Sequence, residues 1–176
     1  MTLEAFADTI VPGEKRSVDD RAVAGAAAGG GAVASGAVEL LETPAVGLAT
    51  ALGDIVDALN GHALEHAAEH GLALDGSVPP FVALPFAHRT ALVQTLTGPA
   101  HQQRDIWVAL ALFSNMAFDT AAHLHTAEAI EAGHPGLATL GFAKPDADGV
   151  WRFPDYSYRR QLANVHPNTT ASGSPA

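Results

Sequence analysis

Residues 106–118, Ile-Trp-Val-Ala-Leu-Ala-Leu-Phe-Ser-Asn-Met-Ala-Phe, are apolar on almost every side of a helix. A helix that is hydrophobic all round is typically buried among other helices. The helical pattern continues on both sides of this stretch, from about His101 to Ala132. We therefore expect residues 101–132 to form the central helix of an all-α fold, enclosed by the others.

A second long helix is expected before it. From Leu48, the core positions 52, 55, 59, 62 and 66 follow in steps of three or four, which is the spacing of one buried helical face. Thr43 and Pro44 suit the N-cap and the first turn of this helix. Positions 62 and 66 are His62 and His66, so two histidines continue a core stripe.

Three shorter helices complete the expected set, over residues 3–10, 35–42 and 85–97. The Gly-rich run 22–38 is too short and too broken by glycines to span a membrane, and we read it as a loop that leads into a short helix. The predicted fold is thus an irregular antiparallel bundle of about five helices over residues 1–133. An extended C-terminal arm, residues 134–176, wraps over the bundle, so that residues 1–176 form a single helical domain.

Composition excludes several classes of protein. The formal net charge of -10 disfavours binding to nucleic acid or to an anionic membrane surface. The chain has no Cys, which excludes disulfides, iron–sulfur clusters, thiolate zinc sites and a cysteine nucleophile. The N-terminal residues lack the basic segment of an export signal, so we expect a cytoplasmic protein.

Nine histidines raise the question of a metal site. His62, His66 and His123 are the candidate ligands for a site between the two long helices. However, the bundle di-iron signature Glu-x-x-His is reversed here, in His62-x-x-Glu65 and His66-x-x-Glu69. We therefore expect no metal, with a His-rich metal-binding module as an alternative.

A polar line crosses the otherwise apolar central helix at Asn115, Asp119 and His123, with His125 close by. A buried carboxylate beside an imidazole shifts the pKa of both groups, which suits acid/base catalysis. The alternative is a hydrogen-bond network that anchors the C-terminal arm. These four residues are the candidate catalytic set if the chain is an enzyme.

The arm carries a segment suited to a protein interface, because aromatic and Arg side chains are enriched at interface centres. The predicted partner-binding residues are Trp151, Arg152, Phe153, Tyr156, Tyr158, Arg159 and Arg160. The same rings could instead pin the arm onto its own bundle.

Four motifs in this order resemble the gluconate 2-dehydrogenase subunit 3 family: residues 6–13 (Phe-Ala-Asp-Thr-Ile-Val-Pro-Gly), residues 31–41 (Gly-Ala-Val-Ala-Ser-Gly-Ala-Val-Glu-Leu-Leu), Phe86-x-x-Arg89-x-x-Leu92, and residues 140–142 (Leu-Gly-Phe). Residues 118–123 and 134–137 resemble more closely an offshoot of that family without an assigned function. The resemblance implies a small helical accessory subunit that binds and escorts a large flavin-dependent dehydrogenase or oxidase of the glucose-methanol-choline type. FAD would then lie in the partner, with no cofactor in this chain.

Three functions follow as hypotheses. The first is this accessory subunit, which is not itself catalytic. The second is a stand-alone helical enzyme of a biosynthetic pathway that uses the Asn/Asp/His cluster, and the third is the His-rich metal-binding module.

Overall fold

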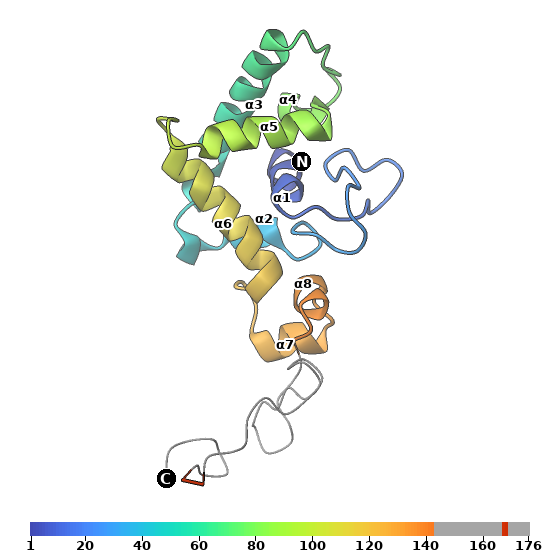
Figure 1. The fold of residues 1–176 in the computed structure, drawn as a ribbon, viewed down its shortest axis with the longest axis vertical. Coiled ribbons are helices and arrows are strands. Elements are labelled where there is room, and N and C mark those ends of the chain that lie inside the picture. Colours follow the sequence, from blue (N-terminus) through green and yellow to red (C-terminus); the bar gives the residue numbers. More distant parts are fainter. Residues whose placement is uncertain (143–166, 169–176) are drawn as a thin grey trace.

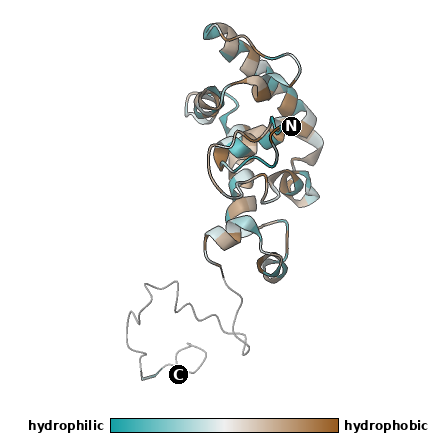
Figure 2. Cartoon of the chain, turned by 90° about the vertical axis from the view of Figure 1, so that its right-hand side faces the viewer, coloured by the Kyte–Doolittle hydropathy of each residue, from teal (hydrophilic) through white to brown (hydrophobic). Residues whose placement is uncertain are grey.

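The computed structural model describes residues 1–142 and 167–168, and within them it contains helices and no strand (Figure 1). The predicted all-α helical bundle is therefore confirmed. Both hydrophobic and hydrophilic residues occur along the helices, as expected for helices that bury one face and expose the other (Figure 2). The elements are α1 Thr2–Ile10, α2 Ala37–Glu42, α3 Leu52–Glu69, α4 Pro80–Ala83, α5 Phe86–Thr97, α6 Arg104–Thr120, α7 Thr126–Glu131 and α8 Pro135–Thr139, with short 3₁₀ turns at Pro44–Val46 and Ala49–Ala51.

The first helix, α1, occupies the centre of the bundle and packs against α2, α3, α4, α5 and α6. Its residues Ala5, Phe6 and Ala7 are fully buried, and the Phe6 ring lies 6.3 Å from the ring of Phe81 at the start of α4. Small side chains on both sides of Phe6 let the neighbouring helices approach closely. A short, Ala-containing helix is therefore the one around which the bundle is built.

The expected helices at 3–10, 35–42 and 85–97 are present as α1, α2 and α5. The second long helix begins later than its sequence suggested, because Pro44–Val46 forms a 3₁₀ turn that ends at Gly47 with a left-handed φ of 76°. The α-helical part, α3, then runs from Leu52 and buries Ile55, Leu59 and His66, so the predicted core stripe is confirmed at these positions.

The predicted single helix over 101–132 is wrong. It is two helices, α6 and α7, separated at Ala121, whose φ of 49° is left-handed. This conformation costs a non-glycine residue about 1–2 kcal/mol. Ala121, in the turn that joins α6 to α7, is fully buried against Ala129 of α7 and Leu137 of α8. This packing compensates for the backbone strain.

The expectation that this helix is enclosed by the others is also wrong. The buried stripe of α6 consists of Trp107, Leu110, Ser114 and Ala117, which lie on one side of the helix. Leu112 on the opposite side is 57% exposed. The apolar side chains of α6 are therefore buried in the core on one side of the helix and exposed to solvent on the other.

The chain after Gly133 is not extended at its start. Pro135–Thr139 forms α8, which packs against the C-terminal end of α6. The His134 side chain caps this helix by accepting a hydrogen bond from the Leu137 N–H (3.3 Å). The arm expected from residue 134 thus begins as part of the folded body. Residues 143–166 and 169–176 lie outside the described residues.

Candidate functional site

Of the four predicted catalytic residues, the structure brings only Asn115 and Asp119 into contact. Asn115 and Asp119 face each other one turn apart on α6, and the Asn115 Nδ2 donates a hydrogen bond of 2.7 Å to Asp119 Oδ2. The second carboxylate oxygen, Oδ1, is buried and has no hydrogen-bond partner. The Asn115 and Asp119 pair is therefore assembled, with one acceptor unused.

His123 lies apart from this pair, beyond the turn at Ala121. Its ring lies so close to Gly36 that a Cβ at that position would overlap it, and its centroid is 6.3 Å from that of the His134 ring. The pKa of His123 is lowered, mainly by burial and in addition by the nearby His134. Its Nδ1 is buried without a partner, so the structure does not join His123 to Asp119. His125 is exposed at the start of α7.

Two residues that the sequence analysis missed complete this region. The His134 Nε2 donates a hydrogen bond of 3.0 Å to the Ser35 carbonyl oxygen, because its Nδ1 already accepts from Leu137. The Ser35 hydroxyl is buried without a partner. Ser35, Asp119 and His123 thus hold three of the four unpaired buried side-chain atoms among the described residues. A buried water would satisfy such groups.

The candidate metal ligands are not brought together. His62 and His66 lie on α3, and the His62 ring contacts Trp107 near the N-terminal end of α6 (5.8 Å between rings). His123 lies beyond the C-terminal end of α6, which is about 20 Å farther along that helix. Within residues 1–142 and 167–168, no three ligand-type side chains are placed to hold a metal ion.

His62 and His66 belong instead to a histidine-rich groove between α3 and α5. The groove has a volume of about 300 Å³ and is lined by His62, His66, His70 and His101, together with Glu65 and Glu69. His88 on α5 contacts His66 and His70 from the other side. Five of the nine histidines are therefore gathered at the end of the molecule opposite α7 and α8 (Figure 1).

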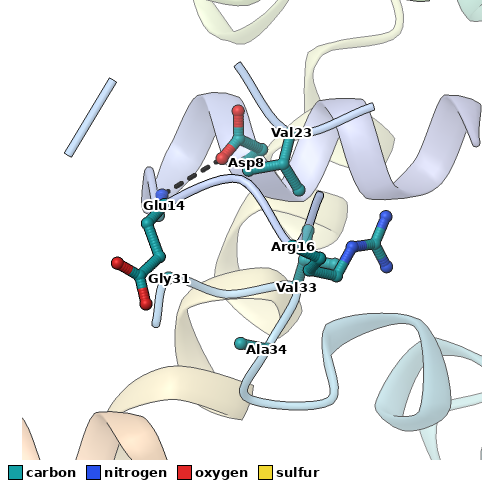
Figure 3. A pocket seen from close by; sticks show the side chains of 8 residues that line it. Asp8, Glu14, Arg16, Val23, Gly31, Val33 and Ala34 are labelled. Atoms are coloured by element: carbon teal, nitrogen blue, oxygen red, sulfur yellow. Dashed lines mark hydrogen bonds between the residues drawn. The ribbon is translucent and has the colours of Figure 1, made fainter. Parts of the chain in front are cut away.

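A small pocket lies under the loop that joins α1 to α2 (Figure 3). Asp8 anchors this loop, since its carboxylate accepts hydrogen bonds from the N–H groups of Gly13 (3.1 Å) and Ala24 (2.8 Å). The pocket has room for about 10 Å³, which is the size of one water molecule. It is a packing feature of the loop and cannot admit an organic substrate.

Five exposed apolar side chains lie on α6 and in the segments that follow α6 and α8. Leu112 and Met116 stand one turn apart on the outward side of α6. Leu124 follows α6, and Leu140 and Phe142 follow α8, which packs on the same end of α6. We call these five residues the α6–α8 apolar face. The predicted partner-binding residues 151–160 lie outside the described residues.

Comparison with known proteins places the chain in one family. The model of the "Family of unknown function (DUF5987)" matches residues 1–176, so the chain belongs to that family. No curated protein and no solved structure matches the chain. The resemblance to gluconate 2-dehydrogenase subunit 3 is not tested by these findings and stays a prediction.

Proposed function

We propose that this member of the DUF5987 family is a non-catalytic accessory subunit that docks through its α6–α8 apolar face. One observation supports the proposal most directly. Leu112, Leu124 and Leu140 are each about half exposed, at 57%, 48% and 51%. Exposed apolar side chains can mark a protein interaction site, because the free energy falls when a partner removes them from water.

The partner that we propose is a large FAD-dependent dehydrogenase or oxidase. This part of the proposal rests on the family resemblance of the sequence motifs. FAD and the redox chemistry would belong to the partner, with this chain as its binding and stabilising subunit. Among the described residues no helix is both long and apolar enough to cross a membrane. A cytoplasmic location stays part of the proposal.

The motif residues fit a binding role better than a catalytic one. Asp8 lies in the first motif, is buried, and holds backbone N–H groups of the loop after α1. Arg89 lies in the third motif and is also buried, with four backbone carbonyl oxygens as its acceptors. These charged groups are used to build the fold, so they are not available to a substrate.

The proposal is tested by capture of a purified flavin-dependent dehydrogenase of the glucose-methanol-choline type from the native host. A double variant, Leu112→Glu with Met116→Glu, places two charges on the α6–α8 apolar face and should weaken binding at least about tenfold, which corresponds to about 1.4 kcal/mol. The matched control is Leu64→Glu on α3, because Leu64 is as exposed (54%) but lies away from this face. The affinities are measured by titration after circular dichroism confirms folding.

Equal capture by the double variant and by the control would contradict docking through this face. The arm is tested in the same assay with Arg152, Arg159 and Arg160 changed together to Glu, which should also weaken capture. Retained binding by that variant would remove the arm from the proposed interface.

A second candidate function is a stand-alone enzyme that uses Asn115, Asp119 and His123. The observation that favours it is that Asp119 Oδ1 and His123 Nδ1 are buried without a hydrogen-bond partner, although His123 lies apart from the Asn115 and Asp119 pair. The two candidates are separated by activity of the chain alone. An activity that needs no partner and is lost in His123→Gln would favour the enzyme.

A further inference from the structure

Three histidine rings meet where the C-terminal turn of α3 packs against α5. The His66 Nε2 lies 3.1 Å from the His88 Nδ1. The His70 ring stacks on the His66 ring with 4.1 Å between centroids, and its centroid is 5.4 Å from that of the His88 ring in an edge-on arrangement. His66 is 8% exposed, so the contact is largely shielded from water on one side.

The hydrogen bonds of this contact fix how many protons it can hold. A 3.1 Å contact between two ring nitrogens needs one N–H donor and one bare acceptor, so at least one of His66 and His88 is neutral. The His70 Nδ1 donates to the His66 carbonyl oxygen at 2.9 Å, because a carbonyl oxygen can only accept. The arrangement is therefore complete with all three rings neutral, and protonation of both His66 and His88 removes the acceptor.

The surroundings do little to stabilise added positive charge. On α3 the titratable neighbours are His62, Glu65 and Glu69, and His101 faces the groove from the loop before α6. The charge of Glu69 favours protonated His66, whereas His70 and His88 both oppose it. On α5 the remaining charge, Arg89, points to the loop at Arg21 and Ala22.

We propose that His66, His70 and His88 form a proton-sensitive latch that holds the C-terminal turn of α3 on α5 near neutral pH and releases it in mild acid. Release opens the histidine-rich groove. Two cationic rings with nitrogens 3.1 Å apart repel each other and have lost their hydrogen bond, so the closed arrangement cannot accept the second proton.

The direction of the pH effect follows from the depressed pKa of His66. This pKa lies below the value of about 6.5 for a free imidazole. Burial is the largest cause, and the nearby His70 and His88 lower the pKa further. The open form therefore binds more protons than the closed form once the pH falls below about 6.5. The closed form is favoured above that pH and loses stability as the pH falls from there toward the lowered pKa.

The test uses the absence of Cys in the chain. Ala68 on α3 and Gln94 on α5 are both exposed, so the double variant Ala68→Cys with Gln94→Cys can carry one spin label on each helix. The distance between the labels is measured by pulsed electron paramagnetic resonance. At about pH 7.5 we expect one narrow distance distribution, and at about pH 5.5 a longer and broader one.

His88→Gln should lower the pH midpoint of this change by about one unit, since it removes one cation and its amide oxygen accepts from His66 at any pH. His70→Gln removes the stacked ring and should shift the midpoint in the same direction, and it decides the question if His88→Gln does not fold. The control is His125→Gln, which alters an exposed histidine far from the latch and should leave the midpoint unchanged. A wild-type distance that does not change with pH, or the same midpoint in the two latch variants and in the control, would overturn the proposal.

Discussion

Arg89 shows how a single buried side chain organises the chain around it. Its guanidinium donates to the carbonyl oxygens of Leu84 (3.0 Å), Ala22 (2.7 Å), Arg21 (3.1 Å) and Val82. Burial lowers its pKa, while the charge of Asp8 acts in the opposite direction. Arg89 therefore ties the loop after α1 to the end of α4 through backbone groups that would otherwise lack partners.

Replacement of Arg89 by Met should lower the free energy of unfolding by roughly 3 kcal/mol or more, because several buried carbonyl oxygens lose their donor at once. The matched control is Arg21→Met. The Arg21 side chain makes one exposed ion pair with Asp75, so its loss should cost less than about 1 kcal/mol. Urea denaturation of both variants checks the difference, and losses of similar size would contradict this account of Arg89.

Docking of α8 on α6 depends on a glycine. A Cβ at Gly136 would overlap the carbonyl oxygen of Phe118, which is a backbone atom at the end of α6 and cannot rotate away. The two helices therefore approach more closely than any other residue at position 136 would permit. This contact brings the C-terminal part of the apolar face beside α6.

Gly136→Ala and Gly61→Ala should change stability in opposite directions. Gly136→Ala must move α8 and should lower the free energy of unfolding by about 1–3 kcal/mol. Gly61 lies inside α3 with open space around it, so alanine there should raise that free energy by about 0.5–1 kcal/mol through helix propensity. Thermal unfolding of the two variants measures both signs. A stabilising Gly136→Ala would show that α8 does not dock in this way.

Helix type was predictable from the sequence wherever apolar spacing decides it, as in α1, α3 and α5. The break after Thr120 was not, because Ala121 carries no local stop signal. Its left-handed conformation is imposed by burial against Ala129 and Leu137, which are contacts formed only in the folded chain. The approach of Gly136 to Phe118 is likewise visible only once α8 and α6 are placed.

The candidate sites show the same limit. Spacing on one helix correctly paired Asn115 with Asp119, since residues four apart share a face. The spacing could not show that His123 lies against Gly36, because α6 ends at Thr120, between Asp119 and His123. It also could not show that His88 comes to His66 from another helix.

At the scale of the whole molecule the two ends differ. The α3–α5 region and the α7–α8 region lie toward opposite ends of the molecule (Figure 1). Histidines line the groove between α3 and α5, and exposed apolar side chains lie on α6 and after α6 and α8. The net charge of -10 produces general repulsion between copies of the chain. This division supports a chain that functions in a complex with another protein.

The most direct test is purification of the tagged chain from its native host, followed by mass spectrometry and a visible absorption spectrum. An accessory subunit should co-elute with a much larger polypeptide at a fixed ratio, and the complex should show the visible absorption of flavin. Elution of the chain alone and without flavin absorption, from cells that express a flavin-dependent dehydrogenase of the glucose-methanol-choline type, would contradict the proposal.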